Sequence, residues 1–335
     1  MTTHFELEAP FGYSLSAAAD FYAGFAPMGG AALQRERNLQ LAFRLDHSFE
    51  AVSATLSQHD TRLSVEVEGT ANHPAVTAQL TRMLGLDVDG KAWAAIGEVD
   101  PVMGAVKRHF PGFFTAGFPS PYEAGVGGVL SQRSSVKQAA SLRRQLSQAH
   151  GDQVGGLQVV PAPDQLLRVK SFPGIAPQKL EVLHGLARAG LNGTIDAQRL
   201  RAMPQEQALE VLQELHGVGP WTASHMLLRG ASVQDALPLA EPRVLRAFTL
   251  AYERPEADFA LCAEAWRPFR MWASIALVRN LMSPSPRGRG EGRGEGPHQH
   301  QAPDGTRTLR RGGSETCQAQ PFQLDTRTAA VIDGP

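Results

Sequence analysis

Three short stretches in the first third of the chain alternate between apolar and polar residues. An alternation of period two is typical of strands that bury one face. The stretches are residues 38–45, 49–56 and 61–69. Residues 73–84 follow with their apolar positions spaced for one side of a helix. We therefore predict a small antiparallel sheet with a helix, forming an α+β domain over residues 1–115.

From residue 116 onward the apolar spacing becomes helical and stays so up to residue 282. Most of the expected helices have proline near their start, where its missing N–H breaks no intrahelical hydrogen bond. They are Pro121–Ser131, a helix capped by Ser135, Pro163–Val169, Pro177–Ala189, Pro204–Leu215 and two runs within 259–282 broken near Pro268. The pattern predicts an all-α core over residues 116–282.

The composition changes abruptly at Ser283, where a run of Ser, Pro, Arg, Gly and Glu begins. Such low-complexity sequence cannot bury apolar surface. We therefore predict a disordered tail over residues 283–335. An Arg-Gly nucleic-acid-binding tail is the alternative, but the near balance of charge favours a solvated appendage.

Length and composition set limits on the class of protein. With 335 residues, 42% of them hydrophobic, the chain can bury a substantial core. Its two cysteines cannot form a disulfide framework, a four-cysteine zinc site or a four-cysteine iron–sulfur cluster. The sequence has neither a secretory signal nor an apolar run of membrane-spanning length, so we predict a cytoplasmic protein. The formal net charge of −1 does not favour strong non-specific binding of nucleic acid.

Residues 215–223, Leu-His-Gly-Val-Gly-Pro-Trp-Thr-Ala, join two apolar-periodic runs through a Gly-x-Gly turn. Gly217 and Gly219 can take positive φ, which lets the backbone turn sharply and leaves N–H groups facing outward. Pro220 suits the first turn of the next helix, whose positive dipole end lies at the same place. Outward amides at a helix N-terminus form a site for a phosphate-sized anion. The alternative is an ordinary corner between two helices.

The hairpin string resembles that of the helix-hairpin-helix DNA glycosylases, and most of all the DNA-3-methyladenine glycosylase II family. Further segments similar to the family occur in order along residues 1–282. They are Asp100–Met103, Phe110–Gly112, Phe118–Glu123, Val129–Arg133, Phe172–Lys179, Leu186–Ala189 and Trp266–Ala273. The resemblance implies an α+β fold in which the small sheet domain precedes an all-α glycosylase core.

The resemblance also implies a partner, namely double-stranded DNA with damaged bases, bound by a monomer without a cofactor. The hairpin residues Gly217, Gly219, Pro220 and Thr222 would hold the DNA backbone. The family's hairpins bind a monovalent cation through backbone carbonyls, and no metal site made of side chains is expected. Arg133 aligns with the residue that fills the gap left by the flipped nucleotide. A solvated arginine at a helix–loop junction is the alternative for Arg133.

Trp221, His225 and Trp272 are the candidates for the pocket that receives the flipped base. An indole face can stack on a base and would attract a cationic alkylated one. The alternative for Trp221 is a core residue at the hairpin, and Trp272 is expected in the core or the pocket wall. Bifunctional family members carry lysine where this chain has Trp221. Since indole cannot form a Schiff base, the resemblance implies a monofunctional hydrolase without lyase activity.

Glu241 occupies the position where the family places its catalytic aspartate, just before a helix. Its carboxylate would stabilise an oxocarbenium-like sugar and activate water. Glutamate is longer by one methylene than the family's aspartate, and a displacement of that size can slow an enzyme about 10²-fold. A helix-start carboxylate that interacts with the dipole is the alternative.

The sequence thus predicts a nucleoid-associated base excision repair enzyme that hydrolyses the N-glycosidic bond of alkylated bases such as 3-methyladenine. A catalytically weakened or inactive protein of the same fold, which only binds damaged DNA, is the alternative, and Glu241 separates the two. A protein-interaction module unrelated to DNA is disfavoured by the intact hairpin.

Overall fold

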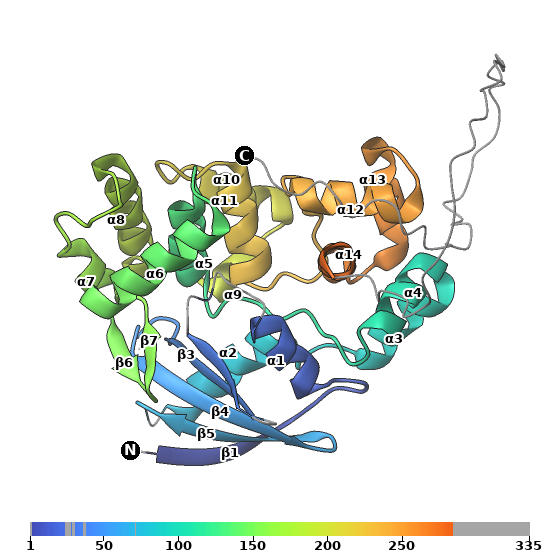
Figure 1. The fold of residues 1–335 in the computed structure, drawn as a ribbon, viewed down its shortest axis with the longest axis horizontal. Coiled ribbons are helices and arrows are strands. Elements are labelled where there is room, and N and C mark those ends of the chain that lie inside the picture. The colour runs from blue at the N-terminus through green and yellow to red at the C-terminus, as the bar shows by residue number, and fades with distance from the viewer. Residues whose placement is uncertain (1, 24–27, 29–30, 36–37, 71, 284–335) are drawn as a thin grey trace, which may run out of the picture.

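The structure is a computed structural model that describes residues 2–23, 28, 31–35, 38–70 and 72–283. In the view of Figure 1 an antiparallel sheet lies below a larger group of helices. The predicted α+β class and the helical core after the sheet are confirmed. The predicted disordered tail lies outside the described residues, and the predicted domain boundary near residue 115 stays a prediction.

The sheet has five antiparallel strands in the order β1-β5-β4-β3-β2. The strands are β1 Thr2–Glu8, β2 Ala32–Arg35, β3 Asn38–Arg44, β4 Ala51–His59 and β5 Arg62–Glu68. The three central strands match the predicted alternating stretches, and in β5 the apolar residues Leu63, Val65 and Val67 are all buried. Strand β1 is an addition to the prediction. It lies at one edge, where none of its side chains is fully buried.

Two helices connect the sheet to the rest of the protein. Helix α1 (Leu15–Ala23) packs on β2 and β3, and α2 (His73–Leu84) is the helix predicted for that segment. Gln79 of α2 donates its amide to the carbonyls of Arg44, on β3, and Pro119, just before the helical core. A small second sheet pairs β6 (Asp152–Val154) with β7 (Leu157–Val159).

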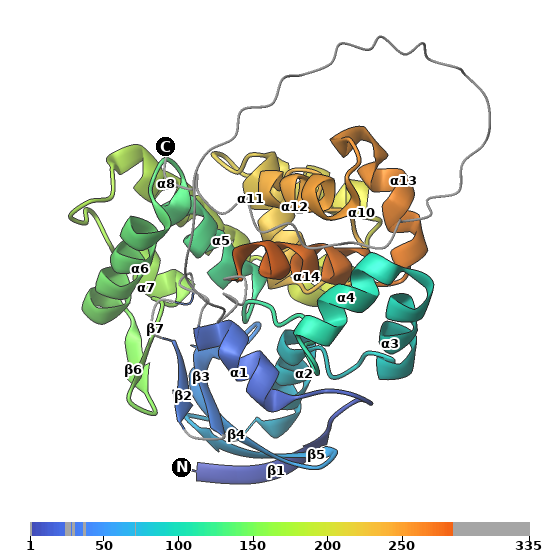
Figure 2. The same cartoon turned by 45° about the vertical axis from the view of Figure 1, so that its right-hand side comes forward.

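Twelve further α-helices are described, and α14 lies between α4 and α12 (Figure 2). They are α3 Gly90–Val99, α4 Pro101–His109, α5 Pro121–Ser131, α6 Val136–His150, α7 Pro163–Leu167, α8 Pro177–Leu191, α9 Ala197–Arg201, α10 Gln205–Gln213, α11 Pro220–His225, α12 Pro242–Tyr252, α13 Phe259–Ala263 and α14 Arg270–Met282. A π-helical turn, Met226–Gly230, continues α11. Short 3₁₀ turns span Glu256–Asp258 and Glu264–Trp266.

The helix starts follow the expected chemistry. Proline opens α5, α7 and α8 as predicted, and Ser135 caps α6 in a reciprocal capping box with Gln138. The helix expected from Pro204 to Leu215 is shorter, because Pro204 is its N-cap and the last residues turn into the hairpin. Helices α3 and α4 were not predicted, although Asp89 and Asp100 cap them.

Helix α5 is the centre of the helical core, and its first ten residues are all buried. It contacts α6, α8, α11 and the π-helical turn. The close approach of α11 needs small residues on α5, since a Cβ on Gly128 would lie 3.2 Å from Cγ2 of Thr222. Inside the core, Glu123 accepts the backbone N–H of Arg44 and forms an ion pair of 2.7 Å with Arg143, which links the sheet to α5 and α6. Among the described helices none is long and apolar enough to cross a membrane.

Candidate active site

A cavity of about 650 Å³ opens between the helical elements, and it is large enough for a nucleobase with its sugar. Its walls come from α1, α5, α6, α11, the π-helical turn, the segment before α12, and α14. The predicted residues Trp221, His225 and Glu241 all line it. The structure thus brings together three candidates that are spread over 21 residues of sequence.

Glu241 is the N-cap of α12, and its carboxylate is held from two sides. Arg243 forms a bidentate pair with it, through Nε to Oε1 at 2.9 Å and Nη2 to Oε2 at 3.0 Å. The indole N–H of Trp221 donates to Oε2 at 3.1 Å. The side chain of Glu241 is 18% exposed. The carboxylate therefore has a fixed direction while one side of the residue stays open to the cavity.

The protonation state of Glu241 results from opposing effects. Burial alone would raise the pKa of its carboxyl, but the hydrogen bonds and charge of Arg243 and the hydrogen bond from Trp221 outweigh burial and hold the pKa below its ordinary value. The group is therefore a carboxylate at neutral pH. A carboxylate is the form required to stabilise positive charge on a sugar.

Trp221 and His225 lie one helical turn apart and stack with ring centroids 5.0 Å apart and planes 9° apart. His225 also packs edge-on against Phe118. Burial, together with the charges of Arg229 and Arg243, lowers the pKa of His225 to about 3, against the opposing effect of Glu241. The imidazole is therefore neutral at pH 7, and the Trp221–His225 pair forms an uncharged aromatic wall.

The hairpin after α10 takes the predicted tight turn, with one difference. Gly217 has φ of +75°, whereas Gly219 has φ of −85° and is the N-cap of α11. Only Gly217 therefore needs the freedom of glycine for its backbone angles. Both glycines and Pro220 are exposed, but Thr222 is buried. A phosphate at this turn would therefore meet the exposed Gly217 and Gly219, whereas Thr222, at 3% exposed, lies beneath the surface.

The turn that carries Arg133 is tied to the hairpin. Gln132 donates its side-chain amide to the carbonyl of Gly217 at 3.0 Å and lies 3.4 Å from Oγ1 of Thr222. Lys179 of α8 donates to the carbonyl of Gln132 at 2.8 Å. Arg133 itself is exposed and has φ of +53°. Its side chain does not line the cavity, but the neighbours Gln132 and Ser134 do, so Arg133 sits at the rim.

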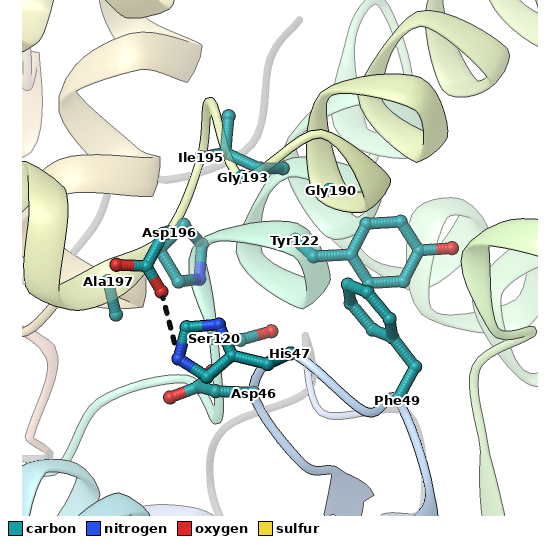
Figure 3. Close-up of a pocket in the computed structure, with 11 residues that line it drawn as sticks. Asp46, His47, Phe49, Ser120, Tyr122, Gly190, Gly193, Ile195, Asp196 and Ala197 are labelled. Atoms are coloured by element: carbon teal, nitrogen blue, oxygen red, sulfur yellow. Dashed lines mark ion pairs between the residues drawn. The ribbon is translucent and has the colours of Figure 1, made fainter.

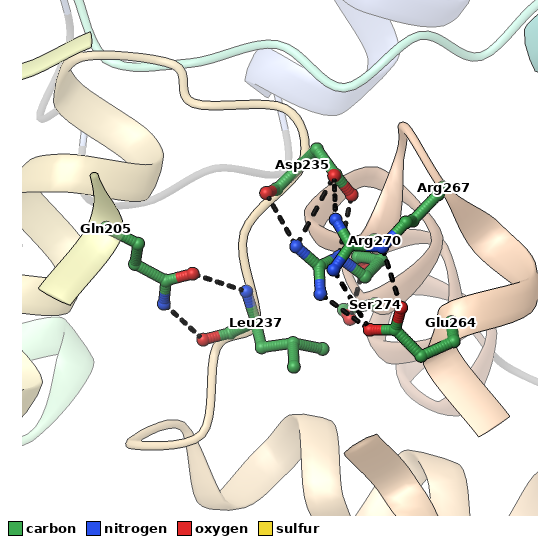
Figure 4. Close-up of polar contacts among 7 residues, drawn as sticks. All are labelled: Gln205, Asp235, Leu237, Glu264, Arg267, Arg270 and Ser274. Carbon is green, nitrogen blue, oxygen red and sulfur yellow. Dashed lines mark hydrogen bonds and ion pairs between the residues drawn. The ribbon is translucent and has the colours of Figure 1, made fainter. Parts of the chain in front are cut away.

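The segment from Ala231 to Glu241 has no helix or strand, yet it is anchored along its length (Figure 4). Gln205 exchanges two hydrogen bonds with the backbone of Leu237. Asp235 forms ion pairs with Arg267 at 2.6 Å and with Arg270 at 2.7 Å. These contacts hold the backbone that leads into Glu241. Asp235 is the nearest aspartate before Glu241 in the sequence, and its carboxylate is already paired with Arg267 and Arg270.

Trp272 lies in the core, one of the two places expected for it, and its assignment as a pocket residue is not supported. Its ring is buried against Trp93, Phe114 and Phe269 and does not line the cavity. The neighbour Met271 lines it instead. One step along a helix turns a side chain by about 100°. The motif alone therefore could not show whether Met271 or Trp272 faces the cavity.

A second hollow near His47 is too small for a base. Its volume is about 30 Å³, the space of a single water molecule. Figure 3 shows His47 and Asp196 facing each other there, with Nε2 and Oδ2 3.4 Å apart. The large cavity is therefore the candidate site.

No family model matches the chain. It is 27% identical over 208 residues to the DNA-3-methyladenine glycosylase of Bacillus subtilis, across 58% of this chain and 69% of the relative. It is 28% identical over 184 residues to DNA-3-methyladenine glycosylase 2 of Escherichia coli, across 52% of this chain and 63% of that relative. Among solved structures, the 3-methyladenine DNA-glycosylase of Archaeoglobus fulgidus superimposes with a TM-score of 0.68 at 20% identity, over 83% of this chain and 99% of that one.

The sequence matches span less than 70% of either curated relative. The structural match covers both the sheet and the helical core. Together they confirm the resemblance inferred from the hairpin: the chain is similar in sequence to these two DNA-3-methyladenine glycosylases and shares the fold of a third.

Proposed function

We propose that the protein is a monofunctional DNA repair glycosylase that hydrolyses the N-glycosidic bond of damaged bases in double-stranded DNA, 3-methyladenine among them. One observation carries the proposal. The carboxylate of Glu241, fixed by Arg243 and Trp221, lies on the wall of a base-sized cavity beside the hairpin. The kinship with DNA-3-methyladenine glycosylases supports the same reaction.

In this reaction the target nucleotide leaves the duplex and enters the cavity. The hairpin amides would hold a backbone phosphate next to the cavity, and Arg133 at the rim would fill the vacated stack. As the bond to the base breaks, positive charge grows on the sugar, and the carboxylate of Glu241 would stabilise it and orient water. Arg243 and Trp221 keep that carboxylate ionised and aimed.

The test is a single-turnover assay with an alkylated duplex, measuring free 3-methyladenine and strand cleavage separately. We expect base release that leaves an abasic site in an intact strand. Borohydride should trap no covalent complex, because the hairpin carries Trp221 where a Schiff base would need an amine. Strand cleavage with borohydride trapping would contradict the monofunctional assignment.

A Trp221→Phe variant tests the role of the indole N–H. Phenylalanine keeps an aromatic ring beside His225 but removes the donor to Oε2 of Glu241. Losing that bond raises the pKa of Glu241, and activity requires the ionised form, so the acid limb of the pH–rate profile should move to higher pH. We also expect a threefold to tenfold loss of rate, roughly, at neutral pH. An unmoved acid limb would show that the bond does not tune the carboxylate.

The alternative, a protein of this fold that binds damaged DNA without cleaving it, is favoured by one feature of the site. Both carboxylate oxygens of Glu241 are engaged with Arg243, which reduces their capacity to interact with sugar or water. Wild-type protein that binds alkylated duplex DNA tightly but releases no base would establish this alternative.

A further inference from the structure

The turn that carries Arg133 and the hairpin around Gly217 both contact helix α8. Lys179 of α8 donates its ammonium group to the carbonyl of Gln132, the residue before Arg133, at 2.8 Å. Val182 of the same helix packs so closely against Gly217 that a Cβ on the glycine would lie 2.2 Å from its Cγ2 atom. Lys179 and Val182 are three residues apart, so they share one side of α8. This side of the helix therefore supports the turn and the hairpin together.

Gln132 links the two segments directly. It is the C-cap of α5, and its side-chain amide donates to the carbonyl of Gly217 at 3.0 Å. Arg133 follows with φ of +53°, in the left-handed region that a residue other than glycine keeps only where its surroundings fix it. The direction in which the Arg133 side chain leaves the backbone thus depends on where Gln132 is held.

Both the backbone and the side chain of Gln132 are held. Its carbonyl accepts from Lys179 and, at 3.3 Å, from the hydroxyl of Ser134. The bond from its amide to Gly217 lies at the protein surface, where water could serve the same carbonyl almost as well. Satisfying that carbonyl is therefore not a sufficient reason for the bond. Its distinct consequence is a fixed separation between the hairpin and the turn.

The inference rests on the proposed function, in which the hairpin holds a phosphate and Arg133 fills the stack that the flipped nucleotide leaves. Both groups act on one duplex, whose own geometry sets the distance between a phosphate and the neighbouring stack. We propose that Gln132 is a positioning residue that couples these two actions. Its bond to Gly217 keeps the turn where the guanidinium enters the stack while the hairpin holds the phosphate.

The test is a double-mutant cycle on Gln132→Met and Arg133→Ala, measured as the single-turnover rate of 3-methyladenine release. Methionine keeps the unbranched length of glutamine but removes the amide donor, and we expect a rate about threefold to tenfold lower. If Gln132 acts by positioning Arg133, the double variant should be no slower than Arg133→Ala alone. Effects that multiply in the double variant would show that the two residues act independently and would overturn the inference.

A second measurement separates positioning from DNA binding. 2-Aminopurine placed next to the 3-methyladenine nucleotide gains fluorescence when that nucleotide leaves the stack. In Gln132→Met this gain should be smaller, whereas undamaged duplex, held by backbone contacts, should bind as it does to wild type. Gln145→Met is the matched control, because Gln145 is exposed, lies outside the cavity and bonds to Ser141 within α6. It should change neither measurement.

The remaining outcomes are also decisive. Weaker binding of undamaged duplex by Gln132→Met, in proportion to its slower base release, would mean that Gln132 supports the hairpin alone and would overturn the coupling. A full rate in Gln132→Met or in Arg133→Ala would overturn the inference and leave the glycosylase function standing. If wild type released no base, the proposed function would fail and the inference with it.

Discussion

Replacing Glu241 with glutamine should lower the single-turnover rate of base release by about 10²–10⁴-fold while damaged duplex DNA still binds. Glutamine has nearly the same shape, and its one carbonyl oxygen can still accept from Trp221 and from Nη2 of Arg243, although its amide nitrogen cannot accept from Nε of Arg243. It cannot supply the negative charge that a cationic sugar requires. The measurement is free base released from alkylated duplex, together with a binding isotherm on the same DNA.

Glu256→Gln is the control for this variant, because it removes one negative charge from an exposed residue outside the cavity. It should leave the rate unchanged. Equal rates for wild type and Glu241→Gln would show that another group performs the reaction. Loss of binding and of rate together, with a lowered melting temperature, would instead point to the helix-cap role of Glu241.

The length of Glu241 is itself part of the site. Aspartate would withdraw the carboxylate by more than an ångström from Trp221 and Arg243, whose contacts measure 3.1 and 2.9 Å. We therefore infer that the length of glutamate is needed to reach both Trp221 and Arg243. The single-turnover rate of base release should be lower in Glu241→Asp than in wild type. A faster aspartate variant would show that the glutamate is merely tolerated.

Local signals in the sequence account for much of the fold. Periodicity predicted β3, β4 and β5, and proline or serine marked the starts of α5 to α8. Strand β1 was not predicted, because an edge strand with half-buried side chains needs few apolar residues. Helices α3 and α4 were not predicted either. Asp89 and Asp100 are their N-caps, and an aspartate followed by apolar residues at helical spacing could have indicated both helices.

The candidate site was only partly accessible from the sequence. Glu241, Trp221 and His225 were found because they lie in or near the family motif. Arg243 had a usable signal, since an arginine two residues after a helix-cap carboxylate can fold back onto it. No sequence signal pointed to Phe21 or Arg279 as cavity residues, because α1 and α14 meet at the cavity only through tertiary packing.

The two hairpin glycines should respond differently to alanine, since the structure assigns them different roles. In Gly217→Ala the new Cβ would lie 2.2 Å from Cγ2 of Val182, at a φ of +75° that alanine rarely adopts. We expect a loss of about 2–4 kcal/mol in the free energy of unfolding, measured with urea. The hairpin would also move, so DNA affinity should fall with stability.

Gly219→Ala separates binding from folding. Its φ of −85° suits alanine, and a Cβ there meets nothing within 4 Å in the protein. Stability should therefore stay nearly unchanged. If the amides of this turn hold a phosphate, the added methyl group would stand where the DNA backbone approaches, and affinity should still fall by about tenfold. Unchanged affinity in Gly219→Ala, beside a destabilised Gly217→Ala, would mean that the hairpin is a structural corner and that DNA is held elsewhere.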